Sequence, residues 1–327
     1  MRMIQSIAVV TALAAATVLA PASARAEYPD RPITFIVPYA PGGTTDMLAR
    51  TLGHKLEEKL GRPVVIENKS GASSAVAASY VAKAPADGYT ILMATSTTMA
   101  INSAVFKKLS YAPLIDLSPV SMVATVPFLL VINSELPVQS IADLVKLAKS
   151  KPGELSYGSS GPGSAAHLFM QQFASITGGK LTHVPYRGTS PALYDVVAGR
   201  TQMMFADVST ALPLVRSGKL RALGVSTAKR LPNAPDLPTL AQNGVPGYEA
   251  SSWQMVVIAS KTPKEIVARL SEALRQVQAD PAFQAQTAAR GVIPDAGQTP
   301  EELTKFVAEE IKRWAKVVED AGVLHSM

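Results

Sequence analysis

Five short turns hold most of the residues in this sequence whose types could bind a ligand. Their sequences are YAPGGTTD (39–46), TSTTMAIN (95–102), YGSSGPGSAAH (157–167), YRGTSPA (186–192) and ADVSTALP (206–213). Each follows a predicted strand and precedes a predicted helix, and helix N-termini present amides without partners and a partial positive charge. Glycine lets the backbone come close to a ligand, while serine and threonine add hydroxyl donors. The turns therefore predict a site for a small anion.

Several polar residues of these turns have a structural interpretation beside a binding one. Asp46 stands where an acid stabilises the first turn of a helix, so it could act only as a cap. His167 and His183 fit structural roles better than catalysis, and Arg187 fits a solvated salt bridge as well as a carboxylate contact. Asp207 ends a predicted buried strand, where an acid is either a helix cap or a contact for a ligand hydroxyl, ammonium group or water.

Sequence patterns typical of enzymes are absent. Lys69-Ser70-Gly71 has the wrong order for a phosphate-binding loop, and GSSGPGS (158–164) does not match the dinucleotide-binding pattern. No serine lies in a G-x-S-x-G motif, and the four histidines lack the spacing of a zinc site. We therefore predict no catalytic residue, no metal site and no cofactor. An enzyme acting on a carboxylate is kept as an alternative.

The elements that position these turns alternate along the chain in the manner of an α/β protein. The predicted strands are 33–39, 63–68, 90–96, 155–160, 181–186, 201–207 and 220–226. Leu48, Leu52, Leu56 and Leu60 form one stripe of a helix that Gly61 is placed to end.

Three later helices are expected to begin with a capping box, in which a hydroxyl and an acid three residues later satisfy free amides. The pairs are Ser140 with Asp143, Thr262 with Glu265 and Thr299 with Glu302.

Two long extended runs, 123–133 and 248–260, interrupt this alternation and could carry the chain between two domains. We therefore predict that residues 27–126 and 248–327 form the first domain and residues 127–247 the second. The C-terminal helices would pack on the first domain. Tyr248 and Trp253 are expected to fill the hinge rather than the binding site.

The N-terminal segment, residues 1–26, has the features of a cleaved signal peptide. Arg2 precedes an uncharged apolar run at 7–20, and Ala24-Arg25-Ala26 offers the small-x-small pattern of a cleavage site. The apolar run is shorter than the roughly 20 residues that span a bilayer, although an uncleaved membrane anchor is the alternative. With no cysteine, the chain has neither a lipoprotein anchor nor a disulfide. We expect a soluble protein of a Gram-negative periplasm.

The composition favours a large core and a small-molecule ligand. Hydrophobic residues make up 47% of the 327 residues, and this length suggests two domains. Loss of Arg2 and Arg25 with the signal peptide leaves 29 of the 31 basic residues against 25 acidic ones, a net charge of +4. The basic residues are scattered and not interleaved with aromatic ones, so nucleic acid is not an expected partner.

The mature chain resembles the periplasmic solute-binding receptors of tripartite tricarboxylate transporters over nearly its whole length. The resemblance is carried by YPDRPITFIVPYAPGGTTDMLAR (28–50), VVIENKSGASS (64–74), ADGYTILMATS (86–96), YGSSGPGSAAHL (157–168), HVPYRGTSPAL (183–193) and DLPTLAQNGVPGYE (236–249). PGGTTD alone would be a weak signal, but the ordered series of turns is specific. Tyr39 departs from the family, which more often carries phenylalanine there, and this difference could alter the pocket wall.

The resemblance implies a two-domain Venus-flytrap fold of the type II-like class, with each domain a mainly parallel sheet flanked by helices. It also implies a small organic acid as ligand, either an aliphatic di- or tricarboxylate, an acidic amino acid or an aromatic acid. Such receptors deliver the ligand to a permease with large and small membrane subunits. The second alternative is that a loaded receptor presents the ligand to a membrane kinase. A monomer is expected.

Carried over by position, the resemblance places one carboxylate between the first turn of domain one and a Gly/Ser turn of domain two. The site residues implied by the resemblance and the turns are Tyr39, Ala40, Gly42, Gly43, Thr44, Asp46, Thr95, Ser96, Ser160, Gly161, Gly163, Ser164, His167, Arg187, Gly188, Thr189 and Asp207.

Overall fold

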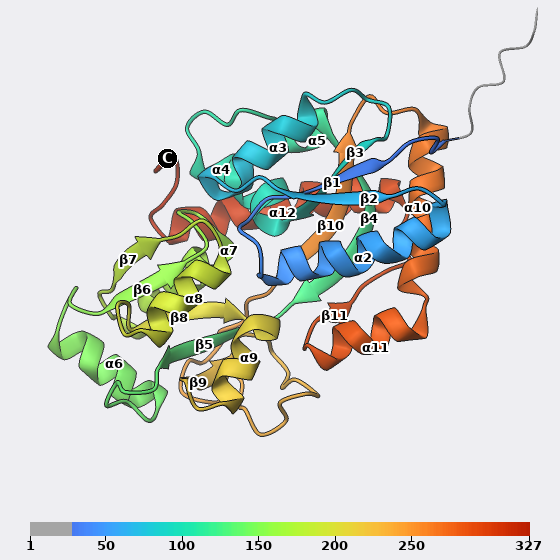
Figure 1. Ribbon diagram of the computed structural model, residues 1–327. Coiled ribbons are helices and arrows are strands. Elements are labelled where there is room, and N and C mark those ends of the chain that lie inside the picture. Colours follow the sequence, from blue (N-terminus) through green and yellow to red (C-terminus); the bar gives the residue numbers. More distant parts are fainter. Residues whose placement is uncertain (1–27) are drawn as a thin grey trace, which may run out of the picture.

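The computed structural model describes residues 28–327 and divides their strands between two sheets (Figure 1). The strand order is β11-β4-β10-β3-β1-β2 in the first sheet and β7-β6-β8-β5-β9 in the second. The predicted signal peptide, residues 1–26, lies outside the described residues. The α/β class predicted from the sequence is confirmed.

The first sheet is mixed. Its strands are β1 (Ile33–Val37), β2 (Val64–Asn68), β3 (Thr90–Thr95), β4 (Leu117–Val126), β10 (Ser252–Ala259) and β11 (Ile293–Pro294). The strand β1 pairs in parallel with β2 and β3, whereas β10 is antiparallel to both β3 and β4. The short β11 pairs antiparallel with the end of β4.

The second sheet repeats this plan with the strands β5 (Phe128–Asn133), β6 (Ser156–Ser159), β7 (Thr182–Pro185), β8 (Met203–Asp207) and β9 (Leu220–Val225). The strand β6 is parallel to β7 and β8, and β5 is antiparallel to β8 and β9. The expectation of mainly parallel sheets is therefore corrected to mixed sheets. Segments that cross between the sheets contribute antiparallel strands, while strand–helix–strand units contribute the parallel ones.

Helices flank both sheets. The first sheet carries α2 (Thr44–Leu60), α3 (Ala75–Ala82), α4 (Asn102–Val105), α5 (Pro113–Asp116), α10 (Lys264–Gln278), α11 (Pro281–Ala289) and α12 (Pro300–Asp320), with short helices η1 (Ala72–Ser74) and η2 (Thr97–Ile101). The second carries α6 (Ile141–Ser150), α7 (Ala165–Thr177), α8 (Thr189–Val197) and α9 (Val208–Arg216). We call each sheet with its helices the first and the second lobe.

The helix α2 follows the leucine stripe of the sequence. Leu48, Leu52 and Leu56 are fully buried, and Leu60 is 8% exposed. Gly61 ends the helix in the left-handed region, at φ 66°, and its amide donates to the carbonyl of Glu57.

Two of the three expected helix caps are present. The full capping box of Thr299 and Glu302 opens α12, and the Ser140 hydroxyl accepts from the Asp143 amide at the start of α6. At α10 the hydroxyl of Thr262 instead donates to the carbonyl of Ala259, and the helix begins at Lys264 without a side-chain cap.

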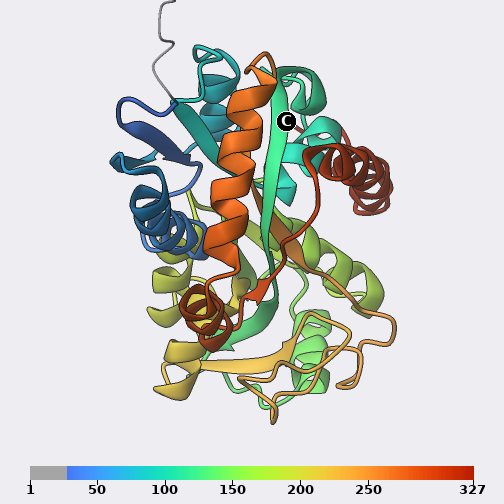
Figure 2. The same cartoon turned by 90° about the vertical axis from the view of Figure 1, so that its right-hand side faces the viewer.

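Two crossings connect the lobes. Only Pro127 separates β4 in the first sheet from β5 in the second, and the chain returns between β9 and β10. Figure 2 shows α10 lying across the first sheet beside β4. The lobes also pack on each other through Phe169 of α7 and Trp314 of α12, whose rings stack 6.1 Å apart.

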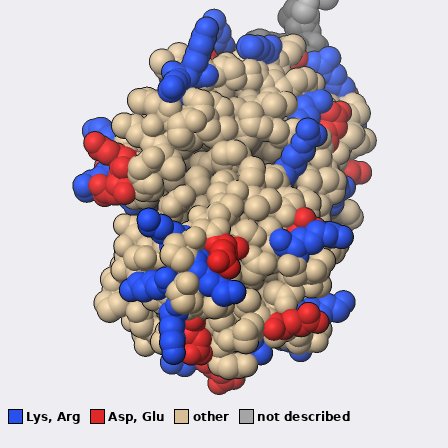
Figure 3. Space-filling view, turned by 90° about the vertical axis from the view of Figure 1, so that its left-hand side faces the viewer, with Lys and Arg blue, Asp and Glu red and all other residues tan. Residues whose placement is uncertain are grey.

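The surface carries charges of both signs. On the face in Figure 3, Lys and Arg side chains lie interspersed with Asp and Glu, without a broad patch of one sign. Among residues 28–327, no helix has the length and apolar character that would carry it through a bilayer.

Candidate functional site

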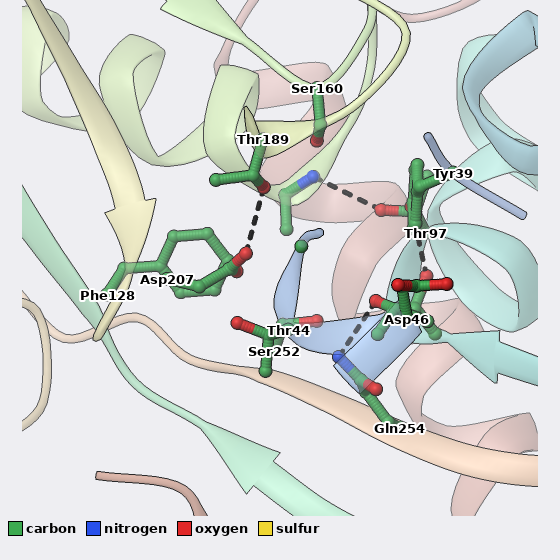
Figure 4. Close-up of a pocket in the computed structure, with 14 residues that line it drawn as sticks. Tyr39, Thr44, Asp46, Thr97, Phe128, Ser160, Thr189, Asp207, Ser252 and Gln254 are labelled. Carbon is green, nitrogen blue, oxygen red and sulfur yellow. Dashed lines mark hydrogen bonds between the residues drawn. The ribbon is translucent and has the colours of Figure 1, made fainter. Parts of the chain in front are cut away.

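A small cavity lies between the two lobes, where helix N-termini from both sides meet (Figure 4). Its volume is about 30 Å³, above the roughly 10–15 Å³ that a cavity needs to hold one water molecule. The first lobe contributes Tyr39, Gly43, Thr44, Thr45, Asp46, Thr95, Thr97, Ser252 and Gln254, and the second contributes Phe128, Ser160, Ala165, Thr189 and Asp207.

The N-terminus of α2 opens on this cavity. Gly43 is its N-cap residue in an extended conformation, and no side chain caps the helix. Gly43, Thr44 and Thr45 all line the cavity. First-turn amides have no partner within a helix, so this end of α2 offers donors and a partial positive charge to whatever occupies the cavity.

Asp46 fixes the turn that precedes α2. Its carboxylate accepts hydrogen bonds from the amide of Gly42 (3.0 Å), the guanidinium of Arg50 (3.0 Å) and the amide group of Asn68 (2.9 Å). Burial raises the pKa of Asp46, but these hydrogen bonds more than offset it, and the pKa lies below its usual value. The Gly42 amide therefore binds within its own turn and is not directed at the cavity.

Hydroxyl groups from the turn after β1, from β3 and from η2 form another part of the first-lobe wall. The Tyr39 hydroxyl lies 3.2 Å from Thr95 Oγ1, which lies 3.3 Å from Thr98 Oγ1. Burial raises the pKa of Tyr39, so the phenol stays protonated. Tyr39 thus places a hydrogen-bonding hydroxyl at the cavity, which a phenylalanine there would lack.

The turn between β6 and α7 uses most of its amides within the protein. The Gly163 amide donates to His167 Nδ1 (2.9 Å), and the Ser164 hydroxyl caps α7 by accepting from the His167 amide (3.4 Å). The Ala165 amide crosses to the first lobe and donates to Thr97 Oγ1 (3.2 Å). The turn therefore contacts the first lobe directly.

His167 lies behind this turn, in a cluster of stacked rings. Its ring lies 4.0 Å from that of His183, whose Nε2 is 2.6 Å from the Ser159 hydroxyl. Burial lowers the pKa of His167 to about 3, with a further contribution from His183, and burial lowers the pKa of His183 to about 4. Both rings are neutral at physiological pH, and His167 positions the Gly163 amide from outside the cavity.

Asp207 and Thr189 form the second-lobe wall. Asp207 ends β8 and is 8% exposed, and its Oδ2 accepts a 2.8 Å hydrogen bond from the Thr189 hydroxyl. Burial raises the pKa of Asp207 to about 6, against the opposing effect of hydrogen bonds from Thr189 and Thr44.

Direct hydrogen bonds join the lobes around the cavity. Thr44 Oγ1 bonds to Ser209 Oγ, and the Ser73 hydroxyl donates to the carbonyl of Pro162. Gly163, at φ 70°, sits so close to the first lobe that a Cβ there would lie 2.6 Å from Val105 Cγ1. Glycine at this turn therefore lets the two lobes approach each other.

The cavity brings together eight of the residues predicted from the sequence, namely Tyr39, Gly43, Thr44, Asp46, Thr95, Ser160, Thr189 and Asp207. The other nine lie around it: Ala40, Gly42, Ser96, Gly161, Gly163, Ser164, His167, Arg187 and Gly188. The Ser96 hydroxyl is buried against Ser252, at 2.8 Å.

Two open grooves adjoin the cavity. Gly42 lines one of about 490 Å³ together with Tyr194 and Arg290. Gly161 and Arg187 line the other, of about 410 Å³. Arg187 is exposed there, and none of the ion pairs in residues 28–327 involves it.

Sequence reasoning missed six residues that line the cavity, which are Thr45, Thr97, Phe128, Ala165, Ser252 and Gln254. Thr45, Thr97 and Ala165 lie inside the quoted turns. The other three lie on strands next to the crossings between the lobes, Phe128 on β5 and Ser252 and Gln254 on β10. In the described part of the chain, no three His, Asp or Glu side chains gather as they would to hold a metal ion.

Comparison with known protein families gives one match over most of the chain. Residues 48–323 match the model of the tripartite tricarboxylate transporter family receptor. Protein BugT of Bordetella pertussis is 37% identical over 311 residues, which cover 95% of this chain and 95% of BugT.

Solved structures agree with this match. The protein Rpa4515 of R. palustris, solved with adipate, is 42% identical to this chain, with a TM-score of 0.88 over 91% of this chain and 99% of the other. MatC (Rpa3494) from Rhodopseudomonas palustris, solved with bound malate, is 31% identical, with a TM-score of 0.85 over 89% of this chain and 100% of the other. Both neighbours have the same fold as this chain, and each was solved with an organic acid, adipate or malate.

Proposed function

The chain belongs to the tripartite tricarboxylate transporter receptor family, and from this premise we propose that it is a periplasmic protein that captures a small organic carboxylate between its lobes. The observation that supports this most is the uncapped N-terminus of α2, which opens on a cavity shared by both lobes. We place no catalytic step there. The signal peptide predicted for residues 1–26 supports the periplasmic location.

The carboxylate is held chiefly by backbone amides and hydroxyls. The amides of Gly43, Thr44 and Thr45 donate to it from the first lobe, and Ser160 donates its hydroxyl from the second. Hydrogen bonds to a carboxylate are stronger than those between neutral groups. A ligand that accepts from both lobes therefore binds the closed arrangement better than an open one.

Binding requires the lobes to move. The cavity of about 30 Å³ is smaller than the roughly 300–1,000 Å³ of typical ligand pockets, so a ligand enters when the lobes are apart and is enclosed as they close. We propose that residues 27–126 with 248–327 and residues 127–247 move as two domains. Their hinge would lie at the crossings, at Pro127 and in the segment before β10.

We propose that a membrane permease of large and small subunits recognises the closed, ligand-bound form. The receptor would act as a monomer. Adipate and malate are the first ligands to test, because they are bound in structures of similar proteins. Those two structures support a carboxylate and leave an aromatic acid or acidic amino acid as further candidates.

A thermal-shift screen of organic acids tests this function. At 100 times its dissociation constant, a ligand adds about 2.7 kcal/mol to the free energy of unfolding, which appears as a raised Tm. We expect adipate or malate to raise the Tm and neutral sugars to leave it unchanged. A response to sugars without any response to acids would contradict the proposal. Turnover of the acid on long incubation would favour an enzyme instead.

A further inference from the structure

The cavity between the lobes has an unusual charge balance for a site that takes an anion. Among the described residues that line it there is no Lys, Arg or His, and the two charged side chains are Asp46 and Asp207. Asp46 is paired with Arg50, which lies outside the cavity. Asp207 has no cationic partner in the described ion pairs, so its charge would oppose an incoming carboxylate.

We propose that Asp207 makes capture of the carboxylate proton-linked, because it takes up a proton on binding and donates that O–H to a ligand oxygen. This inference rests on the proposed function. The protonated carboxyl replaces a repulsion between two anions with a hydrogen bond, and one proton enters with each ligand. Asp207 is then a specificity-determining residue that admits carboxylates at slightly acidic pH.

The position of Asp207 suits this role. Its side chain lies at the end of β8 beside the phenyl ring of Phe128, in a buried wall that water solvates poorly. Thr189 occupies Oδ2 with a 2.8 Å hydrogen bond, and Thr44 of α2 lies within hydrogen-bonding range of the Asp207 carboxylate. Figure 4 shows Asp207 beside the ring of Phe128 and bonded to Thr189, with Thr44 close by. A ligand oxygen held by the first turn of α2 would therefore lie next to Asp207.

The other titratable groups around the cavity do not compensate the negative charge of an ionised Asp207. Tyr39 faces it from the first lobe as a neutral phenol, and Asp46 adds a second negative charge from α2. Arg187 and Arg290 line the two adjoining grooves, not the cavity. Burial already raises the pKa of Asp207 to about 6. A bound anion raises it further, so protonation near neutral pH needs only a modest additional shift.

Calorimetry with adipate from about pH 6 to about pH 8 tests the proposal, because both adipate carboxyls stay ionised over most of that range. We expect the Kd of the wild type to rise at least tenfold, with uptake of nearly one proton at about pH 7 when buffers of different ionisation enthalpy are compared. Asp207→Asn keeps a hydrogen-bond donor without titrating. Its Kd should stay constant over this range, and at about pH 8 should be lower than that of the wild type.

The control is Asp236→Asn, which removes one exposed acid from the same lobe and should behave as the wild type does. A pH-independent Kd for the wild type, with no proton uptake, would overturn the proposal. So would loss of binding in Asp207→Asn at every pH, which would mean that the ionised carboxylate contacts a ligand ammonium or hydroxyl group. A failure of the proposed function looks different, because then no acid would stabilise the wild type at any pH.

A measurement without ligand checks the same side chain. Because the folded-state pKa of Asp207 lies above its unfolded value of about 3.9, the stability this group contributes is lost as the pH rises through about 6. The Tm of the wild type should fall relative to that of Asp207→Asn as the pH rises from about 4 to about 6. A constant Tm difference would contradict a buried, uncompensated Asp207.

Discussion

The amide of Ala40 in the first lobe donates a 3.1 Å hydrogen bond to the carbonyl oxygen of Arg187 in the second. This bond joins the turn before α2 to the turn before α8, next to the cavity. Gly188 follows directly, at φ 154°, and a Cβ there would lie 3.2 Å from the Ala40 nitrogen. The two turns therefore touch through backbone atoms, and a larger residue at 188 would hold them apart.

Gly188→Ala should hinder closure. The added methyl group crowds Ala40 in the closed form only, so we expect adipate to bind about tenfold more weakly, a difference of about 1.4 kcal/mol. Calorimetry gives the Kd, and small-angle scattering with adipate reports the compactness of the protein. The control is Gly218→Ala, which also has a positive φ but no atom within 4 Å of the added carbon. Equal effects of both variants would exclude a role for lobe contact.

Asp46→Asn should destabilise the turn before α2. The substitution removes the charge that accepts from Gly42, Arg50 and Asn68 in a residue that is 4% exposed. We expect a loss of about 1–3 kcal/mol in the free energy of unfolding at neutral pH, measured by urea denaturation. Glu301→Gln, an exposed acid in the first turn of α12, should lose less than about 0.5 kcal/mol.

The pH dependence of this loss follows from the sign of the pKa shift. The folded-state pKa of Asp46 lies below its unfolded value of about 3.9, so the stability it contributes is present above that pH. It is lost as the pH falls through the folded-state pKa. The difference between wild type and Asp46→Asn should therefore shrink in acid, and a difference that grows in acid would contradict the network.

Local sequence patterns predicted the strands and α2 well, because the leucine stripe and Gly61 encode that helix within one segment. The same reasoning was less successful for the turns, because it expected backbone amides there to be free that have partners within the protein. The Gly42 amide is taken by Asp46 and the Gly163 amide by His167, each four residues later in the chain. Such side-chain partners compete with a ligand for the amides at a helix N-terminus.

The remaining residues of the cavity depend on contacts between distant segments. Gln254 reaches the cavity because β10 runs antiparallel to β3, and its amide group donates to Thr45 at 3.0 Å. Phe128 faces it because the chain changes sheets at Pro127. The sequence marked both strands as crossings, but which of their side chains face the cavity depends on how the two lobes pack.

Substitution of His167 should change both binding and the response to acid. His167→Asn can keep an acceptor near the Gly163 amide, whereas His167→Leu removes it and leaves a buried donor without a partner. At pH 7 we expect His167→Leu to be less stable than His167→Asn by about 1–2 kcal/mol and to bind adipate more weakly. Similar stability and affinity for the two variants would contradict a positioning role for the ring.

The pKa of His167 is shifted in the opposite direction to that of Asp207, and its effect on stability therefore appears in acid. Its folded-state pKa of about 3 lies below the unfolded value of about 6.5, so stability is full above about pH 6.5 and falls as the pH drops toward 3. Between these values His167→Asn should lose stability less steeply than the wild type, by up to about 1.4 kcal/mol per pH unit. Parallel curves for the two proteins would show that the ring takes up a proton as readily in the folded state as in the unfolded state.

Glu310 of α12 joins its helix to the first sheet through Trp253 of β10 and also bonds to Trp314 within the helix. Its Oε2 accepts from the indole nitrogens of Trp253 (2.7 Å) and Trp314 (2.9 Å), and both indoles are buried. Glu310→Ala leaves both donors unpaired, so we expect a loss of about 2–4 kcal/mol in the free energy of unfolding. Glu310→Gln keeps an acceptor and should lose about 1 kcal/mol.

Urea denaturation followed by tryptophan fluorescence measures the stability of both variants. Because Glu310 does not line the cavity, each folded variant should bind adipate as the wild type does. Equal stability of Glu310→Ala and the wild type would mean that the indoles find other acceptors.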